Sequence, residues 1–369
     1  MYSKKDYLMR GKALLTNMYF PGHTKLSTLM IYATSLCNSK CNHCNIWAKR
    51  PIENLSFEKI VEIVSSKCVT QNTTIGLEGG EFILHPEYEK ILQWLQVHHP
   101  KYDLLSNCLL PDKVIDAVNK YKPRRLYVSL DGGSEEAYKK VRGVTGYEKV
   151  IKVIENCKDI VPISIMYTET PWNNFNDLKD VIKIAKSYDI DIRIGIYNNI
   201  DYFDTKILAH QKCNIDTDSP LVNIENFAAS IPEEVKTTEE NYDFMLLYDD
   251  WMKGNTKLKC YSLRDSIVIH PNGNVPICQN LHLTLGNVNE KSLDDILCSP
   301  ETIKTQKQYS KTCNQCWINF HSKYDIVLLR SLEKIFPHKI IELFYGNYQW
   351  GCNKKMTYKE YVNNKTCKN

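Results

Sequence analysis

Short apolar segments alternate with longer amphipathic segments along the first half of the chain, from Leu26 to Gly195. The short segments are rich in β-branched and aliphatic residues, and the segments between them repeat apolar residues at helical spacing. Strands that alternate with helices in this way predict a parallel sheet with right-handed crossovers. The predicted strands are Thr28–Thr34, Thr73–Leu77, Asp103–Ser106, Arg125–Leu130, Pro162–Tyr167 and Asp191–Ile196.

The number of strand–helix units limits the fold further. Six units are fewer than the eight of a closed (β/α)8 barrel, so we expect an α/β fold built on an open, partial (β/α)6 barrel. The helix predicted after Ser56 shows the underlying pattern, because Phe57, Ile60 and Val64 share one helical face and Ser56 is a favourable N-cap.

The strand–helix rhythm ends after Gly195, and a second, small α+β domain is expected towards the C-terminus. Asn272-Gly273 lies between the apolar runs Ser266–His270 and Val275–Cys278, a pattern that predicts a β-hairpin. We therefore expect an N-terminal extension (1–25), the partial barrel (26–200), a bridging segment (201–257), the α+β domain (258–320) and a helical tail (321–369).

Composition and charge narrow the class of protein. The chain has 369 residues and a net charge of +4, with no strong basic excess, which gives no reason to expect nucleic acid as a partner. No apolar run is long enough to predict a membrane span. The N-terminal segment Met1–Arg10 is charged and lacks the apolar core of a signal peptide, so we expect a cytoplasmic protein.

Fourteen cysteines are many for such a chain, and in the absence of an export signal they indicate metal binding rather than disulfides. Cys37, Cys41 and Cys44 form a C-x3-C-x2-C motif directly after the first predicted strand. Three thiolates on one short loop can bind an iron–sulfur cluster and leave its fourth iron open to another ligand. A zinc site with His43 as the fourth ligand is the alternative.

Polar residues also follow the other predicted strands. Because parallel α/β folds bind ligands at the carboxyl ends of their strands, these residues are expected to lie near the cysteine motif. Gly79 and Gly80 would let the backbone approach a ligand closely, Glu81 could pair with an ammonium group, and Arg142 with a carboxylate. The residues at the strand ends are Cys37, Glu81, Asn107, Asp131, Glu169 and Asn198.

The cysteine motif and these strand-end residues together resemble the radical S-adenosylmethionine (SAM) superfamily, over roughly Leu26 to Asn198. His43 departs from the family, which usually has an aromatic residue at this position, and it is grouped here with the cofactor-binding residues. The resemblance implies a [4Fe–4S] cluster on the three cysteines, with SAM on its open iron. It also implies that Gly79, Gly80 and Glu81 hold the amino group of SAM, and that Ser106, Asn107, Ser129, Asp131 and Arg142 contact its ribose and carboxylate.

A second group of cysteines lies in the predicted α+β domain, at Cys260, Cys278, Cys313 and Cys316. Four thiolates can complete either a zinc site or an auxiliary iron–sulfur cluster. Their spacing is similar to the twitch domain of radical SAM enzymes, a shortened SPASM domain, which implies one auxiliary [4Fe–4S] cluster. Weaker candidate ligands are Cys298, Cys352 and Cys367, and the isolated thiols Cys68, Cys108, Cys157 and Cys213 are assigned no role.

The resemblance implies that one electron, from an external donor such as flavodoxin or ferredoxin, cleaves SAM to a 5′-deoxyadenosyl radical that abstracts hydrogen from a substrate. Oxidation of a small alcohol or sugar-like molecule is the favoured activity, because only about 27 residues precede the first strand, too few for a separate peptide-recognition domain. The alternative is a ribosomal-peptide maturase that forms thioether or carbon–carbon crosslinks. Substrate contacts are expected from Tyr167, Glu169, Trp172 and Tyr197.

Two hypotheses from other classes remain at this point. One is a non-enzymatic iron–sulfur protein that carries electrons or senses redox state, and the other is a structural zinc protein. Neither would need Glu81, Asp131 and Arg142 to be arranged around an open iron.

Overall fold

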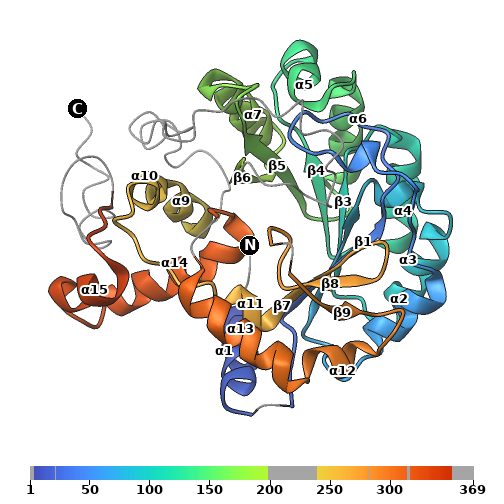
Figure 1. The fold of residues 1–369 in the computed structure, drawn as a ribbon. Coiled ribbons are helices and arrows are strands. Elements are labelled where there is room, and N and C mark those ends of the chain that lie inside the picture. The colour runs from blue at the N-terminus through green and yellow to red at the C-terminus, as the bar shows by residue number, and fades with distance from the viewer. Residues whose placement is uncertain (1–3, 21, 198–238, 282, 314–315, 351–369) are drawn as a thin grey trace, which may run out of the picture.

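The computed structural model describes residues 4–20, 22–197, 239–281, 283–313 and 316–350. A single curved parallel sheet forms its centre, with the strand order β6-β5-β4-β3-β2-β1-β7 (Figure 1). The six predicted parallel strands are confirmed, and a seventh strand, which was predicted as one arm of a hairpin, extends the sheet beside β1. The strands are β1 (Thr28–Thr34), β2 (Thr74–Gly79), β3 (Tyr102–Ser106), β4 (Arg125–Ser129), β5 (Ile163–Glu169), β6 (Asp191–Ile196) and β7 (Ser266–Ile269).

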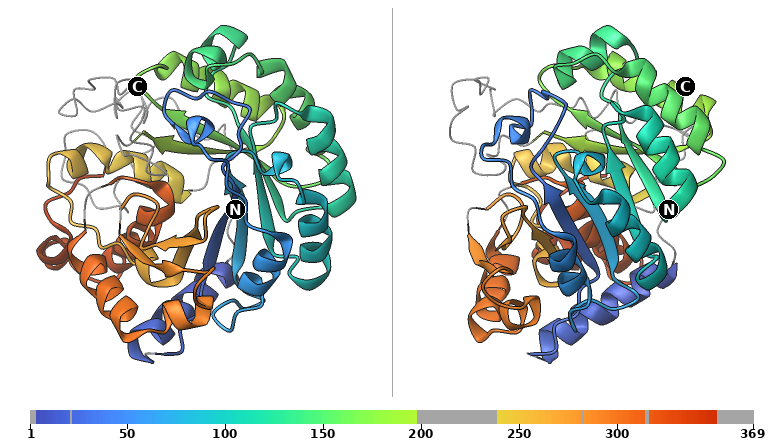
Figure 2. Two further views of the ribbon diagram at one scale, coloured as in Figure 1. Left: turned by 45° about the vertical axis from the view of Figure 1, so that its right-hand side comes forward. Right: turned by 90° about the vertical axis from the view of Figure 1, so that its right-hand side faces the viewer.

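Helices cover the convex side of this sheet and give the half-barrel its outer layer (Figures 1 and 2). Ser56 caps the first of them as predicted, because its side chain accepts a hydrogen bond from the backbone N–H of Lys59. The helices are α2 (Phe57–Val64), α3 (Tyr88–His98), α4 (Pro111–Tyr121), α5 (Glu135–Arg142), α6 (Tyr147–Cys157) and α7 (Phe175–Ser187), with short 3-10 turns η1 (Ile46–Ala48) and η2 (Phe82–Leu84).

The two faces of the sheet bury different residues, since successive side chains on a strand point to opposite sides. Leu29, Ile31, Leu77 and Ile165 belong to the large apolar core beneath the helices. Met30, Tyr32 and Val268 form a separate, smaller cluster on the other face. This second face lines the concave side of the half-barrel, which we call the lumen.

The C-terminal part of the chain contacts both edges of the sheet. The end of the predicted bridging segment contains α9 (Glu239–Leu246) and α10 (Tyr248–Met252), and α9 lies beside the edge strand β6. At the other edge, β7 pairs in parallel with β1. The remaining elements are α11 (Ser262–Asp265), β8 (Asn274–Pro276), β9 (Thr284–Asn287), α12 (Leu293–Leu297), α13 (Pro300–Thr312), α14 (Asn319–Glu333) and α15 (His338–Tyr345).

The predicted pairing of Ser266–His270 with Val275–Cys278 is wrong. The Asn272-Gly273 turn is present, and the N–H of His270 does bond to the carbonyl of Asn274 at 2.9 Å. However, β7 pairs with β1 in the large sheet, and the hairpin of the small domain is formed by β8 and β9. A fully buried strand such as β7, with all four residues inaccessible, is more stable as part of the large sheet than as one arm of an isolated hairpin.

The N-terminal helix α1 (Lys4–Tyr19) packs against the small helix α11 at the amino ends of the strands. Its Arg10 is buried and forms a 2.8 Å ion pair with Asp265, the residue that precedes β7. Asp265 also accepts a hydrogen bond from Ser27, just before β1. The N-terminal extension is therefore joined to the base of the barrel by a buried polar network.

Candidate active site

The three cysteines of the C-x3-C-x2-C motif lie on the loop that follows β1, and this loop is held to the carboxyl end of α5. The backbone N–H groups of Lys40 and Asn42 donate to the carbonyls of Arg142 and Val141, at 3.1 and 3.0 Å. The Asn42 side chain donates to the carbonyl of Lys140 at 2.9 Å. The last carbonyls of a helix have no partner within the helix, so the cysteine loop serves as their cap.

Polar groups surround the thiols themselves. Cys41 is buried, with Ser39 Oγ at 3.1 Å and Arg142 Nη1 at 3.7 Å from its sulfur. Cys37 accepts from Asn107 Nδ2 at 3.8 Å. Burial raises the pKa of Cys37 and of Cys44 to about 12, although a backbone N–H bonded to each sulfur acts in the opposite direction. A bound cation would be needed to hold these buried thiols as thiolates.

Gly79 and Gly80 connect β2 to the cysteine loop through very close backbone contacts. The N–H of Gly80 donates to the carbonyl of Thr34 at 2.7 Å, and the N–H of Glu81 donates to the carbonyl of Leu36 at 2.8 Å. A Cβ atom on Gly80 would overlap the Leu36 carbonyl, and Gly79 also has a positive φ of 127°. The two glycines are therefore required by the path of the cysteine loop.

Replacement of Gly80 by alanine is expected to displace this loop, because the clash is with backbone and cannot be relieved by a side-chain rotation. We expect the variant to bind much less iron on reconstitution and to lose about 1–3 kcal/mol of stability. Gly195→Ala on β6 is the matched control, since its Cβ would have no neighbour closer than 3.8 Å. Iron analysis and thermal unfolding measure both effects, and normal iron binding by Gly80→Ala would contradict the prediction.

Glu81 lies directly below the cysteine loop and is held by the end of β3. Its carboxylate accepts from Ser106 Oγ at 2.9 Å and from the backbone N–H of Asn107 at 2.7 Å. Burial raises the pKa of Glu81 to about 7, and the two hydrogen bonds limit that rise. The side chain of Asn107 turns towards the loop and donates to Asn38 Oδ1 at 2.8 Å. The structure thus brings Glu81, Ser106 and Asn107 together beside Cys37.

Asp131, Arg142 and His43 form a second polar group on the other side of the loop. Asp131 is fully buried, forms an ion pair with Arg142, and accepts the backbone N–H of Thr168 at 2.7 Å. His43 Nδ1 is also buried, and no hydrogen-bond partner for it is present among the described residues. Burial lowers the pKa of His43 to about 4, so the imidazole is neutral. Ser129 lies at the end of β4, two residues before Asp131, and is also buried.

The residues predicted to contact substrate are not all directed to the same place. Tyr167 is fully buried in the large apolar core, on the helix-covered face of β5. Its hydroxyl donates to Glu169 at 3.1 Å. Trp172 and Tyr197 do lie together beyond the strand ends, with ring centroids 5.8 Å apart in an edge-to-face arrangement. Asn198 lies outside the described residues.

The second cysteine group also comes together in space. The pKa of the Cys260 thiol is raised by burial and further by the proximity of Cys316, Cys278 and Cys313. The backbone N–H of Asn280 donates to the sulfur of Cys278 at 3.4 Å. In the part of the chain that the structure describes, no three His, Cys, Asp or Glu side chains are gathered closely enough to hold a single metal ion. A cluster spreads its thiolates over several irons and so accepts a wider spacing.

Cys298 does not join this group, which corrects its assignment as a weak candidate ligand. Its sulfur lies 3.9 Å from that of Cys68, which precedes β2. Cys108 and Cys157 are buried in the core, in keeping with thiols that act as small apolar groups. Cys213, Cys352 and Cys367 lie outside the described residues.

The lumen below the cysteine loop holds residues that the sequence analysis missed. Tyr32 donates to Gln279 Oε1 at 2.9 Å and stacks on His270, with ring centroids 5.8 Å apart. Glu78 is the register partner of Tyr32 on β2 and therefore shares its face. The signal that could have found Glu78 is a charged residue between buried apolar ones in a strand.

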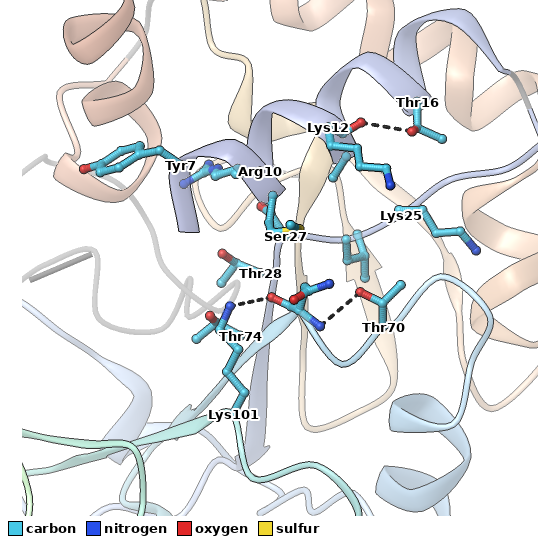
Figure 3. A pocket seen from close by; sticks show the side chains of 14 residues that line it. Tyr7, Arg10, Lys12, Thr16, Lys25, Ser27, Thr28, Thr70, Thr74 and Lys101 are labelled. Atoms are coloured by element: carbon cyan, nitrogen blue, oxygen red, sulfur yellow. Dashed lines mark hydrogen bonds between the residues drawn. The ribbon is translucent and has the colours of Figure 1, made fainter. Parts of the chain in front are cut away.

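A separate pocket of about 300 Å³ lies at the opposite end of the barrel, between α1 and the amino ends of the strands (Figure 3). Lysines at its rim are already bonded to backbone, since Lys25 donates to the Lys67 carbonyl at 2.7 Å and Lys101 to the Asn72 carbonyl at 2.6 Å. Parallel α/β folds place their chemistry at the carboxyl ends of the strands, so this pocket is not the active site.

A parallel half-barrel with a three-cysteine loop at its carboxyl end, followed by a small domain with four clustered cysteines, defines an iron–sulfur enzyme. The radical SAM superfamily matches residues 31–185, and an iron–sulfur cluster-binding domain, SPASM, matches residues 260–317. The chain therefore belongs to the radical SAM enzymes and carries a C-terminal SPASM-like domain. Its cofactors are a [4Fe–4S] cluster, SAM and an auxiliary iron–sulfur cluster.

Two curated relatives are similar in sequence. A GTP 3′,8-cyclase of Clostridium botulinum is 23% identical over 60% of this chain and 73% of its own length. The antilisterial bacteriocin subtilosin biosynthesis protein AlbA of Bacillus subtilis is also 23% identical, over 72% of this chain and 58% of its own length.

Solved structures show the same fold. Streptococcus suis SuiB, bound to its precursor peptide SuiA, aligns over 85% of this chain and 74% of its own, with a TM-score of 0.57 and 15% identity. The protein anSMEcpe, bound to SAM and the Cp18Cys peptide, aligns over 86% of this chain and 99% of its own, with a TM-score of 0.51 and 17% identity.

In the described part of this chain, no helix is long and apolar enough to cross a membrane.

The residues at the cysteine loop fit the cofactors of this class. The three cysteines share one short loop, and backbone N–H groups are already directed at the sulfurs of Cys37 and Cys44, as cluster ligands require. The buried Nδ1 of His43 has no partner in the described chain, so the site retains a polar atom for a bound group to contact. The carboxylate of Glu81 and the guanidinium of Arg142, on either side of the loop, can pair with the ammonium and the carboxylate of the amino acid end of SAM.

Proposed function

We propose that this chain is a radical SAM enzyme that modifies a peptide, a ribosomal-peptide maturase. The observation that supports this most is the fold, which aligns with that of SuiB over 85% of this chain. The structure of SuiB was solved with its precursor peptide bound. The similarity to AlbA, a bacteriocin biosynthesis protein, extends over 72% of the chain, against 60% for the GTP cyclase. The small alcohol or sugar favoured by the sequence analysis has no comparable support.

The roles of the site residues in this proposal follow from their positions. Cys37, Cys41 and Cys44 would hold the [4Fe–4S] cluster and leave one iron for SAM. The carboxylate of Glu81 would receive the amino group of SAM. Arg142, fixed by the fully buried Asp131, would pair with the SAM carboxylate.

When bound, the cluster and SAM would supply the radical chemistry, the abstraction of a hydrogen atom from the substrate. The chain itself would bind and orient the cofactors and the substrate, and shield them from water. Ser106 and the backbone N–H of Asn107 orient the carboxylate of Glu81. In the small domain, Cys260, Cys278, Cys313 and Cys316 would hold the auxiliary cluster, and reducing electrons would come from an external one-electron donor.

Anaerobic reconstitution followed by incubation with SAM, dithionite and candidate peptides tests the proposal. The candidates are synthetic versions of any short peptides that the neighbouring genes encode, each with a cysteine-free version as control. We expect one of them to lose two hydrogens for each crosslink, as measured by mass spectrometry, while 5′-deoxyadenosine accumulates. An unchanged set of peptides together with oxidation of a small alcohol in a parallel panel would contradict the proposal.

A further inference from the structure

Glu78 is a carboxylate in the lumen with no hydrogen bond or ion pair to any described residue. It is the last charged residue of β2 before the glycine pair, and it follows Leu77, which is buried on the helix-covered face. The alternation of the strand therefore turns Glu78 to the concave side. Its register partner there is Tyr32 on β1.

The position of the carboxylate can be given more closely. A Cβ atom on Gly76 would lie 3.3 Å from Glu78 Oε1 and 3.7 Å from Met30 Cγ. The side chain of Glu78 thus bends back over Gly76, beside Met30, and points into the lumen below the cysteine loop. The absence of a side chain at Gly76 leaves the space that the carboxylate occupies.

The other carboxylates of this region are already paired. Asp103 is bound by Arg124 through contacts of 2.8 and 2.5 Å, and Asp191 by Arg193 at 2.8 Å. Glu81 is held by Ser106 and the backbone of Asn107. Among the described residues Glu78 has no such partner, and it is partly exposed, so its carboxylate is accessible to a group on the concave side of the sheet. Desolvation by the surrounding residues, and to a lesser extent Asp103, raise the pKa of Glu78 to about 7, which suits a group that gains and loses a proton at neutral pH.

The opposite wall of this space belongs to the SPASM-like domain. Gln279, the residue after Cys278, accepts the hydrogen bond of Tyr32, whose ring stacks on His270. Glu78 is therefore the register partner of a residue that bonds to the neighbour of Cys278, and it lies two residues before Gly80, which bonds to the start of the first cysteine loop.

We propose that Glu78 is the proton acceptor of the peptide-modifying reaction, and that the reacting part of the substrate lies in the lumen between Glu78 and the wall formed by Tyr32, His270 and Gln279. This inference rests on the proposed function. It predicts a substrate that presents an ionisable X–H group, such as a cysteine thiol, to the carboxylate.

The atom balance of a crosslink requires such an acceptor. Formation of a new C–X bond removes one hydrogen from carbon and one from X. The hydrogen on carbon leaves as an atom, taken by the 5′-deoxyadenosyl radical. The hydrogen on X leaves as a proton, which Glu78 accepts, and one electron passes to a one-electron acceptor of the iron–sulfur class.

The experiment compares the reconstituted wild-type enzyme with Glu78→Gln and Glu78→Asp, using the synthetic peptide that the wild-type enzyme modifies. Glutamine keeps the shape but cannot accept the proton, so we expect crosslinked product per 5′-deoxyadenosine to fall at least about tenfold. Aspartate keeps the carboxylate and should recover part of the yield. Binding of the fluorescently labelled peptide, measured by anisotropy, should change less than about threefold in Glu78→Gln, which a structural defect would not allow.

Glu62→Gln on the outer surface of α2 is the charge-matched control, because its side chain is 53% exposed. Equal product per 5′-deoxyadenosine in Glu78→Gln and wild type would overturn the inference and leave the proposed function intact. Aspartate no better than glutamine, or loss of peptide binding in Glu78→Gln, would also overturn it. A wild-type enzyme that modifies no peptide would overturn both the proposed function and this inference.

Discussion

Replacement of Cys41 by alanine is expected to reduce the formation of 5′-deoxyadenosine by roughly a thousandfold or more. Cys41 is the buried member of the triad and the one that Ser39 and Arg142 contact directly. Two thiolates cannot hold the cluster in the same position, and the open iron that SAM needs would be lost with it. Anaerobic reconstitution, iron and sulfide analysis, and chromatography of the SAM cleavage products measure the result.

Cys157→Ala is the control for this experiment. Cys157 is equally buried, but it lies on α6 in the apolar core and not near the cysteine loop. We expect it to cost some stability and to leave the first cluster in place. Cleavage of SAM at the wild-type rate by Cys41→Ala would show that the first cysteine group has been assigned wrongly.

Replacement of Arg142 by methionine is expected to lower the free energy of unfolding by about 3–5 kcal/mol. The change would leave Asp131 charged, with no solvent exposure and no counter-ion, although the N–H of Thr168 would remain bonded to it. Methionine preserves most of the buried volume, so the loss would report the ion pair and not a cavity. Urea denaturation of the protein before reconstitution measures this effect without a contribution from bound cluster.

Lys139→Met provides the comparison on the same helix. Lys139 is exposed on α5 and should change stability by no more than about 0.5 kcal/mol. An unfolding free energy of Arg142→Met within about 1 kcal/mol of the wild type would mean that Asp131 is stabilised in some other way. The reconstituted variant should also bind SAM more weakly, if Arg142 pairs with the SAM carboxylate as proposed.

Much of the half-barrel could be predicted from local patterns. Thr28–Thr34 and Asp191–Ile196 have the same bounds in the sequence prediction and in the structure, and Ser56 caps its helix as expected. These features depend on the apolar period and on hydrogen bonds between residues that are close in sequence.

Pairing between distant segments could not be predicted in this way. The strand β7 was correctly placed in sequence, but its partner is β1, more than two hundred residues earlier. The sequence of a four-residue apolar strand does not show which edge of which sheet it will join, because every strand has the same backbone N–H and C=O groups. The same limit explains Cys298, whose neighbour proved to be Cys68 and not the second cysteine group.

The sequence by itself determined the class of the molecule: strands that alternate with helices, cysteines at cluster spacing, and polar residues at the strand ends, all of which depend on short-range spacing. Only the tertiary structure decided which face each side chain occupies, turning Tyr167 into the core and Glu78 into the lumen. It also brought Gln279 of the small domain against Tyr32 of the barrel. The physical reason is that burial and hydrogen-bond satisfaction are settled by the whole packed chain, whereas periodicity is settled within each segment.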